Sequence, residues 1–414
     1  MTKTLDGIKS IEDFQLEDKH LFLRLDLNVP LGKNGEIADD TRLRAALPTI
    51  QYAIDKGAKI VLASHLGRPK GPEDRSQYTL EPVAEYLNGA LSKEIILIEE
   101  PKSDAPKALL AGLKPSQIIL LENLRFDSRE EKNDREFAQR MANYTHIYIN
   151  DAFGASHRAH ASIVALPELV PQRGLGFLMK KEIEMLDSIK LHPQAPFVTI
   201  LGGAKVSDKI EVIESLMEKV DVMLIGGAMA YTFLVAQGVE VGSSRVEKDK
   251  VKFAADLLNR AKVRNKKILI PEDHLIVDSI DQPSDKKVTA TAAIPAGWMG
   301  VDIGPKTQRM YAEIIGKSKT IFWNGPMGIF ENPDYAKGTF AVAKAIADSD
   351  ALSVVGGGDS AAAAHASGLA DKFSHISTGG GASLEYLQGE KLPGLEVLRA
   401  PKRSEINPSD GTVA

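Results

Sequence analysis

Short apolar runs rich in Val and Ile alternate along this chain with longer segments of helical period, and this alternation is what most constrains the fold. It favours a parallel sheet covered by helices on both faces, because parallel strands are joined by long crossovers. In the first half, strands are expected at 21–27, 59–63 and 117–121. Between the first two, apolar residues share one helical face: Leu43, Leu47, Ile50 and Ile54. The pattern predicts a β-α-β unit.

The later half repeats this plan without an exact sequence repeat. Its apolar runs each lead into glycines, and they lie at 196–201, 221–225, 319–323, 352–355 and 373–376. At the carboxyl end of a parallel strand, glycine lets a ligand approach the backbone, and the next helix offers free N–H groups to phosphate. Taken alone, any one cluster is better explained as a tight β-α turn. Five clusters in one half favour a phosphate-binding edge.

The length of 414 residues corresponds to two or three domains of roughly 150 residues. We expect two Rossmann-like α/β domains with mainly parallel sheets, each built of three α/β/α layers, at 1–175 and 194–399. The segment 176–193 is helix-like, is bracketed by glycine and proline, and is interpreted as an interdomain helix and hinge. The polar tail, 400–414, carries no period and either is disordered or packs on another domain.

Composition excludes several classes of protein. The net charge of −5 gives no reason to expect nucleic acid or a membrane surface as partner. The absence of cysteine excludes disulfides, thiolate nucleophiles and cysteine-ligated metals. No signal sequence or apolar run of about 20 residues is present, which predicts a cytoplasmic protein.

Common nucleotide motifs fit poorly. Gly316-Lys-Ser318 ends like a P-loop, but Tyr311 stands where that motif requires glycine. The sequence from Gly356 to Ala361 fits a relaxed dinucleotide fingerprint, yet no ribose-binding acid follows about 20 residues later. A dinucleotide-dependent oxidoreductase and a non-catalytic nucleotide-binding protein therefore remain as alternatives. A kinase-type H-R-D loop is excluded because Ala159 follows Arg158.

Three charged residues near the glycine clusters are candidate ligands. Lys205 and Lys209 are spaced to lie on one helical face, and we interpret Lys205 as a phosphate contact. Lys209 could equally be a solvated surface lysine. Asp359 follows three glycines, so it is predicted to act as a helix N-cap, as a Mg²⁺ ligand beside phosphate, or as both.

The first half is rich in arginine, with eleven in residues 1–175 and six in the remainder, which favours a pocket for a polyanion. Arg24, Asp26 and Asn28 alternate with leucines and are predicted to share one face of a strand. A structural Arg24–Asp26 ion pair is the alternative to ligand binding. His157 and His160 could chelate a metal, but no third ligand is evident.

These segments, in order and over nearly the whole chain, resemble the phosphoglycerate kinase family. The resemblance is carried by Arg24–Pro30, Ser64–Pro69, Leu121–Phe126, Asp151–Gly154 with His157–His160, Leu201–Val206, Phe322–Gly328, Gly356–Asp359 and Ser377–Gly381. It implies transfer of the acyl phosphate of 1,3-bisphosphoglycerate to MgADP, giving 3-phosphoglycerate and MgATP, by a monomer whose two domains close. It also implies that the tail at 400–414 returns to the N-terminal domain.

The resemblance implies roles for individual residues. The phosphoglycerate site would consist of Arg24, Asp26, Asn28, Arg42, His65, Arg68, Arg125 and Arg158. The nucleotide site would consist of Lys205, Lys209, Gly226, Gly300, Asn324, Glu331, Gly357, Gly358, Asp359 and Ser360, with Mg²⁺ on Asp359. The transferring phosphoryl group would meet Arg42, Lys205, Lys209, Gly379 and Gly380.

Overall fold

The structure is a computed structural model that describes residues 3–399. The chain divides into two compact units: unit 1 runs to Glu184 and resumes at Lys391, and unit 2 spans Met185–Glu390. This division places 391–399 in unit 1, although these residues were predicted to belong to the C-terminal domain. The expected packing of 400–414 concerns residues outside those described.

Unit 1 contains a seven-stranded sheet. Its strands are β1 (Lys9–Ser10), β2 (His20–Leu25), β3 (Lys59–Ala63), β4 (Glu94–Ile98), β5 (Gln117–Leu121), β6 (Ile147–Asp151) and β7 (Gln172–Leu175). They run parallel in the order β1-β7-β6-β2-β3-β5-β4. The strands predicted at 59–63 and 117–121 have the predicted bounds, whereas β1, β4, β6 and β7 were not predicted.

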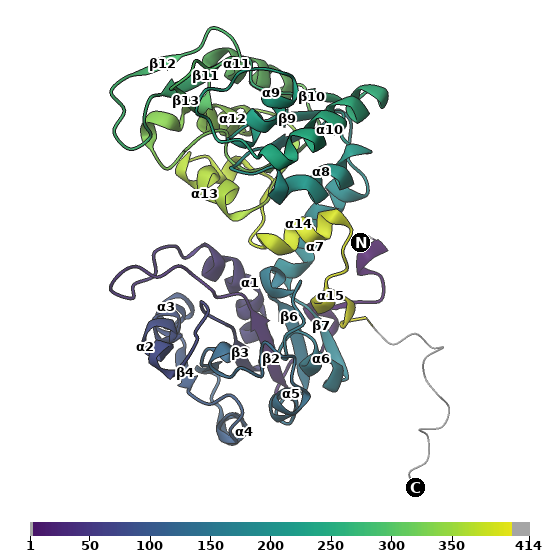
Figure 1. Ribbon diagram of the computed structural model, residues 1–414. Helices are drawn as coiled ribbons and strands as arrows, with labels where there is room; N and C mark the ends of the chain where they lie inside the picture. The colour runs from purple at the N-terminus through teal and green to yellow at the C-terminus, as the bar shows by residue number, and fades with distance from the viewer. Residues whose placement is uncertain (1–2, 400–414) are drawn as a thin grey trace. The chain divides into compact units, whose positions relative to one another are not determined.

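Helices of unit 1 cover this sheet (Figure 1). They are α1 (Thr41–Asp55), α2 (Arg75–Tyr78), α3 (Glu81–Leu91), α4 (Ala105–Gly112), α5 (Arg135–Ala142), α6 (Ala165–Leu169) and α15 (Pro393–Glu396). The core-facing side of α1 consists of Leu43, Ala46, Ile50 and Ala53. This face packs with buried leucines of β2, so the apolar period seen in the sequence becomes the helix-to-sheet contact.

Two segments at the limits of unit 1 are anchored by polar contacts. Helix α7 (Phe177–Lys190) crosses the division between the units, and its Met179 N–H donates to buried Asp151 at 2.9 Å. Helix α15 is held where Asn150 Nδ2 donates to Gly394 O at 3.0 Å. Residues far apart in the chain therefore complete unit 1.

Unit 2 contains a six-stranded parallel sheet of β8 (Phe197–Leu201), β9 (Val222–Ile225), β10 (Lys267–Leu269), β14 (Thr320–Asn324), β15 (Leu352–Val355) and β16 (His375–Ile376). The order is β10-β9-β8-β14-β15-β16. A separate antiparallel sheet consists of β11 (His274–Val277), β12 (Lys286–Val288) and β13 (Met299–Ile303). This second sheet was not predicted.

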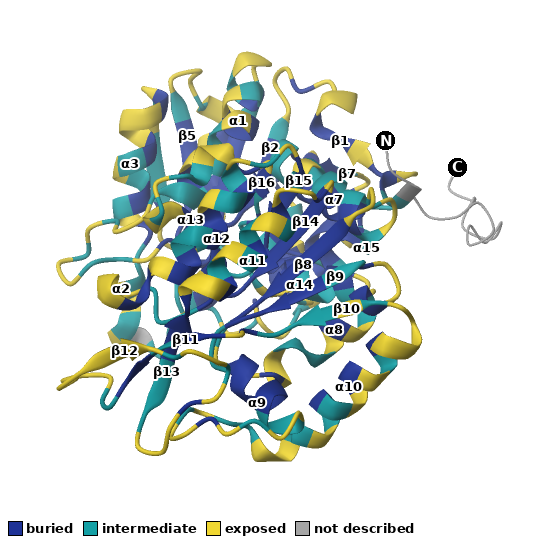
Figure 2. Ribbon diagram, turned by 90° about the horizontal axis from the view of Figure 1, so that it is seen from above, coloured by how far each residue is buried: buried dark blue, intermediate teal, exposed yellow. Residues whose placement is uncertain are grey.

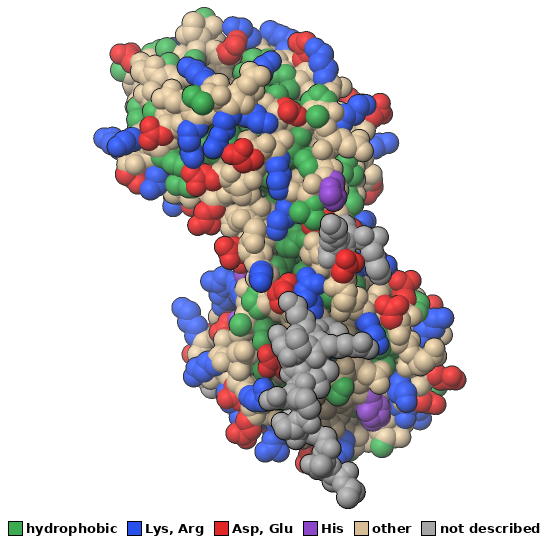
Figure 3. Space-filling model, turned by 90° about the vertical axis from the view of Figure 1, so that its right-hand side faces the viewer, with side chains coloured by type: hydrophobic (Ala, Val, Ile, Leu, Met, Phe, Trp, Pro, Cys, Tyr) green, Lys and Arg blue, Asp and Glu red, His purple; other side chains and the backbone are tan. Residues whose placement is uncertain are grey.

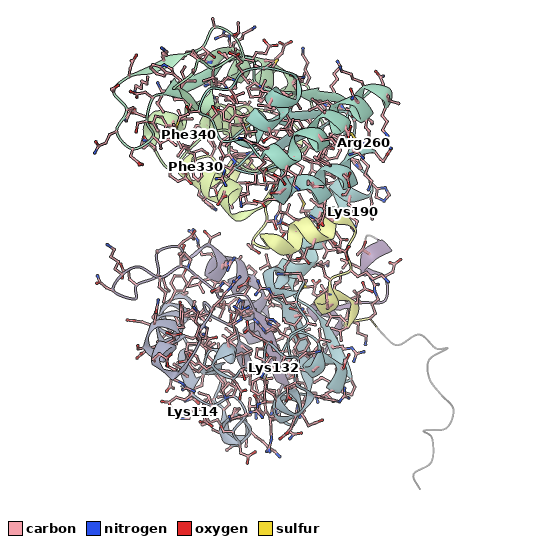
Figure 4. The ribbon with its side chains drawn as sticks, viewed as in Figure 1. Lys114, Lys132, Lys190, Arg260, Phe330 and Phe340 are labelled. Atoms are coloured by element: carbon pink, nitrogen blue, oxygen red, sulfur yellow. The ribbon has the colours of Figure 1, made fainter. Side chains whose placement is uncertain are left out.

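The helices of unit 2 flank the parallel sheet, whose central strands are buried (Figure 2). They are α8 (Ile210–Met217), α9 (Met229–Ala236), α10 (Val251–Val263), α11 (Pro305–Ile315), α12 (Lys337–Ala347), α13 (Gly358–Ala366) and α14 (Gly381–Gln388). Arg260 of α10 pairs with Glu214 of α8 at 3.0 Å (Figure 4). Strands buried on both faces explain the continuous apolar runs of the sequence.

The strand predicted at 21–27 ends earlier, at Leu25. Leu27 N–H donates to Ser64 Oγ at 2.9 Å and Asn28 N–H to Asp26 Oδ1 at 3.3 Å, so these donors are used outside the sheet ladder. Asp26 and Asn28 consequently belong to a loop.

Acidic and basic side chains are interspersed on the face shown in Figure 3. Within residues 3–399, no helix is both long and apolar enough to span a bilayer.

Candidate functional site

The first candidate site lies where β2, β3, β5 and β6 end. We call it the arginine site, and it comprises Arg24, Asp26, Asn28, Arg42, His65, Arg68, Arg125 and Arg158. In the sheet, β6 and β3 lie on opposite sides of β2, so chain connections diverge there. In open α/β sheets, crevices at such points outside the carboxyl ends of strands bind ligands.

The loop after β2 is tied to α1 and to the loop after β3. Arg42 Nη1 lies 3.5 Å from Asp26 Oδ1 and donates to Asn28 O at 2.6 Å. Asn28 Oδ1 accepts from Gly67 N–H at 2.8 Å. These bonds hold Asp26 and Asn28, in the loop after β2, against Arg42 of α1.

Arg24 and His65 meet beneath this loop. Arg24 has no exposed surface, and its Nε donates to Ser162 Oγ at 2.7 Å. Its Nη2 lies 3.3 Å from His65 Nδ1. The alternative of an Arg24–Asp26 ion pair is wrong, because Asp26 pairs with Arg42 instead.

The remaining arginines of the site differ in how they are held. Arg125 Nη1 donates to Gly67 O at 2.7 Å, while its Nε lies 3.2 Å from Glu131. Arg158 Nε donates to His157 Nε2 at 3.1 Å. Arg68 is exposed, and within residues 3–399 no hydrogen bond or ion pair holds its guanidinium. The site therefore has guanidinium groups available to a ligand.

The pKa values of two histidines in this region are lowered by burial and by nearby arginines. Burial lowers the pKa of His65 well below its usual value, and Arg24, Arg125 and Arg42 lower it further. Burial also lowers the pKa of His160 to about 3, with added effects of Arg125, Arg24 and Arg158. Besides burial, Arg24 and Arg125 lower the pKa of both histidines, so these guanidinium groups lie close together. Such a cluster of cations is suited to binding an anion.

The second candidate site is a cavity of about 440 Å³ within unit 2, which we call the glycine pocket. The turn after β8 contributes Gly203 and Ala204, and the turn after β9 contributes Gly227 and Ala228. The other lining residues are Tyr231, Ser243, Arg245, Ile280, Met299, Gly300, Val301, Pro326, Met327, Gly328, Ile329, Glu331 and Asp359. A mostly apolar cavity with a few charged groups is typical of a small-molecule site.

Two glycines of this pocket have no room for a side chain. A Cβ on Gly300 would lie 1.9 Å from the Tyr231 hydroxyl oxygen. Gly227 has φ +64°, and a Cβ there would lie 2.4 Å from Gly203 N. Gly226 lies beside the pocket but outside its lining, and a Cβ there would meet Met327 Sδ. Close packing of turns thus explains much of the glycine signal.

Polar side chains connect the ends of β8, β14 and β15. Lys209 donates to Asn324 Oδ1, and Asn324 Nδ2 donates to Gly356 O at 2.5 Å. Ser360 Oγ accepts from Gly325 N–H at 2.5 Å. Burial lowers the pKa of Lys209, whereas Asp208 and Asp359 raise it. Lys209 is therefore a partly buried cation close to Asp359.

Helix α13 begins differently from the prediction. Its N-cap is Gly357, with φ +93°, so Gly358 and Asp359 lie in the first turn. Asp359 is therefore not the N-cap, which lies two residues earlier at Gly357, where the positive φ favours glycine. Its carboxylate lines the pocket near the positive end of the helix.

The other predicted phosphate contacts follow β8 and β16. Lys205 is exposed, and its ammonium group makes no hydrogen bond or ion pair with residues 3–399. Gly379 N–H donates to Ser377 Oγ at 3.1 Å, and Gly380, with φ +48°, is the N-cap of α14. These three residues lie outside the pocket lining but at the same carboxyl edge of the parallel sheet.

Magnesium fits the chemistry of this pocket. Within residues 3–399, no group of three or more His, Asp or Glu side chains could hold a metal ion by itself. Mg²⁺ commonly takes only one or two protein carboxylates and completes its shell with water and phosphate oxygens. Asp359 supplies such a carboxylate beside glycine turns.

Sequence reasoning missed several residues of both sites. Tyr231, Arg245 and Met299 line the glycine pocket, and one wall comes from the unpredicted strand β13. Glu130 and Ser162 are buried around Arg24. Glu130 lies in a strongly polar stretch, so no periodicity could have singled it out as buried.

Known proteins resemble this chain along most of its length. The model of the family described as phosphoglycerate kinase matches residues 11–390. Two proteins named phosphoglycerate kinase, from Bdellovibrio bacteriovorus and Anaeromyxobacter dehalogenans, are 59% and 51% identical over 399 and 392 residues. These alignments cover 96% and 94% of this chain and 99% of each relative.

Solved structures agree with this match. Phosphoglycerate kinase from Coxiella burnetii superimposes with a TM-score of 0.85 at 38% identity, and that from Pyrococcus horikoshii with 0.82 at 36%. Each comparison covers 94% of this chain and 98% of the other. Because the family model spans far more than half of the sequence and both candidate sites carry the expected side chains, the chain belongs to the phosphoglycerate kinase family.

Proposed function

We propose that this protein transfers the acyl phosphate of 1,3-bisphosphoglycerate to MgADP, producing 3-phosphoglycerate and MgATP, and catalyses the reverse reaction. Family membership supports the reaction class. The observation that carries the proposal is the pairing of a guanidinium-rich site with a glycine-lined pocket, each at the carboxyl edge of its own parallel sheet. One suits a small anionic acid and the other a nucleotide.

In this proposal the arginine site binds phosphoglycerate. Arg42, Arg125 and Arg158 would neutralise its carboxylate and phosphate, because a guanidinium group binds such anions with paired N–H donors. Arg68 would join them from the exposed rim. Asp26, Asn28 and His65 would orient the sugar acid through hydrogen bonds, since their loops are already fixed to one another. Arg24 would hold His65 in place through its contact with His65 Nδ1.

The nucleotide would occupy the glycine pocket. Gly300 and Glu331 line the pocket, and Glu331 would accept hydrogen bonds from the ribose. Gly226, Gly357 and Gly358 lie outside the lining, and their backbone would contact the nucleotide from beside it. Lys209 donates to Asn324, and Ser360 accepts from the N–H of the next residue, Gly325; these three side chains would hold the phosphates. Asp359 would bind Mg²⁺, which when bound supplies positive charge to the nucleotide phosphate oxygens.

The transfer step needs alignment and positive charge rather than a base. The acceptor carboxylate of 3-phosphoglycerate is ionised at pH 7, because an ordinary carboxyl pKa is about 4. Lys205, Lys209, Arg42 and the N–H groups at Gly379 and Gly380 would surround the equatorial oxygens of the migrating phosphoryl group. This set explains how the chain works without a kinase-type aspartate.

A single assay separates this proposal from its rivals. The full chain is mixed with 1,3-bisphosphoglycerate and MgADP, and ATP formation is measured beside a binding titration with NADH. We expect ATP formation and no NADH binding. NADH binding without ATP formation would favour an oxidoreductase, and ADP binding without turnover would favour a non-catalytic nucleotide-binding protein.

The cytoplasmic location, the monomeric state and the lack of a nucleic-acid or membrane partner stay predictions. Size-exclusion chromatography with light scattering of the full chain tests the oligomeric state. A mass near the 44.8 kDa of one chain is expected.

A further inference from the structure

A fully buried carboxylate lies behind the arginine site. Glu130 has no exposed surface and follows the short 3-10 turn Leu124–Phe126 that carries Arg125. Its Oε1 accepts from Ser162 Oγ at 2.5 Å, and its Oε2 accepts from Ser162 N–H at 3.0 Å. Both carboxylate oxygens are therefore directed to one serine.

Ser162 passes this interaction to Arg24. Its hydroxyl group donates to Glu130, so its lone pairs are available to accept the Arg24 Nε–H at 2.7 Å. The Ser162 carbonyl accepts from the Tyr148 hydroxyl group at 2.7 Å, which fixes the serine backbone. Glu130, Ser162 and Arg24 form a continuous buried chain, which we call the Glu130 relay.

Electrostatics explains why a carboxylate is buried near Arg24. A buried guanidinium is costly unless a negative charge compensates it. On balance the pKa of Glu130 is raised, because burial outweighs Arg24, the two Ser162 hydrogen bonds and Arg125, which all lower it. Glu130 is the fully buried carboxylate bonded into this chain, since Asp26 is engaged with Arg42 and Glu131 with Arg125.

The last contact of the relay determines which His65 nitrogen carries the proton. A guanidinium group can only donate, so His65 Nδ1, at 3.3 Å from Arg24 Nη2, must be the acceptor. A neutral imidazole with an accepting Nδ1 carries its proton on Nε2. Arg24 Nη1 donates to Leu25 O and Nε to Ser162, so the guanidinium is held from three sides.

We propose that Glu130 and Ser162 are positioning residues, which hold Arg24 against His65 and thereby keep His65 as the neutral Nε2–H tautomer. The relay leaves an N–H donor on His65 for the ligand of the arginine site. Glu130 and Ser162 are fully buried, so neither would touch that ligand. The part of this inference that concerns phosphoglycerate rests on the proposed function, whereas the tautomer of His65 does not.

The charged groups around His65 come from several elements. Arg24 lies on β2, Arg42 on α1, Arg125 after β5 and His160 after β6, and all lower the pKa of His65. All of them disfavour a second ring proton. The Glu130 relay differs from these other charged groups because its Arg24 contacts one particular ring nitrogen of His65, Nδ1.

The test uses the full chain with ¹⁵N-labelled histidine and long-range ¹H–¹⁵N NMR spectra, in which His65 is assigned from the signals lost in His65→Gln. The wild-type spectrum should show a protonated Nε2 and an unprotonated Nδ1. Ser162→Ala and Glu130→Gln should give a mixture of tautomers. Glu136→Gln, at an exposed position of α5, is the matched control and should leave the spectrum unchanged.

Kinetics provide a second measurement on the same variants. Ser162→Ala and Glu130→Gln should raise the KM for 3-phosphoglycerate by about tenfold while leaving the KM for ATP unchanged, as expected for loss of a buried charge-assisted bond. Thermal unfolding shows whether each variant is folded. If Glu130→Gln is unfolded, Ser162→Ala, which keeps the Glu130 carboxylate, still tests the inference.

Two results would overturn the inference. One is a wild-type His65 protonated on Nδ1; the other is a folded Ser162→Ala protein with the wild-type tautomer and an unchanged KM. Failure of the proposed function would look different, because the chain would then lack turnover while His65 still carried its proton on Nε2.

Discussion

Individual cations in this protein are held to very different degrees. Arg24 is buried and bonded on three sides, whereas Lys205 and Arg68 are exposed. A charge fixed by partners is already oriented before a ligand arrives, and an exposed charge must be ordered by the ligand at an entropic cost. Substitutions at these residues should therefore separate positioning from transfer of the phosphoryl group.

Lys205→Ala should reduce turnover far more than nucleotide binding. If Lys205 contacts the migrating phosphoryl group only in the transition state, its loss costs about 2.7–4 kcal/mol, or roughly 10²–10³-fold in kcat. Steady-state kinetics and calorimetric ADP binding give the two quantities. Lys317→Ala, at an exposed residue paired with Glu313, is the control. An unchanged kcat would remove Lys205 from the transfer step.

Arg158→Ala should raise the KM for 3-phosphoglycerate and leave ADP affinity nearly unchanged. Loss of a charge-assisted contact of about 1.5–3 kcal/mol corresponds to roughly 10–100-fold in affinity. The measurement is initial-rate kinetics with each substrate varied in turn. Comparable losses for both ligands would instead indicate damage to the fold.

At the level of helices and strands, the sites are formed by turns that contact each other and by the first residues of helices. In unit 2, the glycine turns after β8 and β9 contact each other, and the start of α12 is bonded to the end of β13. Lys190, on α7, lies with its ammonium 4.2 Å from the Tyr386 ring centre, so α7 is also tied to α14 (Figure 4). Changes at such junctions should affect whole elements rather than one contact.

Gly227→Ala should weaken nucleotide binding beyond the cost of backbone strain. Gly227 has φ +64° and its new Cβ would meet Gly203, which lines the pocket. Gly238 has φ +79° with nothing within 4 Å, so Gly238→Ala carries the strain without the collision. Gly238→Ala should lose about 1–2 kcal/mol of stability from backbone strain alone, and Gly227→Ala should lose more, because its Cβ also meets backbone atoms of Gly203. Only Gly227→Ala should lose ADP affinity by calorimetry; equal affinities would contradict this.

Asp302 should make the junction of β13 and α12 sensitive to pH. Burial raises its pKa to about 7, although its carboxylate accepts from the N–H groups of Gly338 and Ile303. Because folding raises this pKa above the usual 3.8, its stabilisation is complete below about pH 4 and is lost as the pH rises through 7.

Chemical denaturation from about pH 4 to pH 8 measures this effect. Relative to Asp302→Asn, the wild type should lose stability over that window by up to about 1.4 kcal/mol per pH unit. Asp350→Asn, at an exposed position, is the control and should follow the wild type. Parallel curves for wild type and Asp302→Asn would refute the assignment.

At the scale of the whole molecule, the two proposed substrate sites belong to different units, and α7 crosses the division between them. Phosphoryl transfer requires the reacting atoms to be nearly in contact. It also requires that water, which would hydrolyse an acyl phosphate, be excluded. We therefore propose that ligand binding closes the units on each other and that the segment 171–195, which includes the predicted interdomain helix at 176–193, contains part of the hinge.

Small-angle X-ray scattering should detect this closure. The radius of gyration should fall when 3-phosphoglycerate and a non-hydrolysable MgATP analogue are added together, and change less with either alone. An identical radius with both ligands bound would disprove closure under these conditions.

The alternation of strands and helices could be predicted in part from sequence, because apolar periodicity is a local property. The runs at 59–63 and 117–121 became strands with those bounds, and the apolar face of α1 packs with β2. The glycine turns were also visible, since glycine marks backbone angles and close approaches that other residues cannot adopt. Motif order was enough to name the family.

Tertiary structure alone decided which side chains meet. Asp26 pairs with Arg42 rather than Arg24, Gly357 rather than Asp359 caps α13, and Glu130 is buried although its neighbours in sequence are polar. Each depends on contacts between distant segments, such as the 32 positions that separate Glu130 from Ser162. Local patterns specify elements, whereas burial and charge pairing arise only when those elements pack.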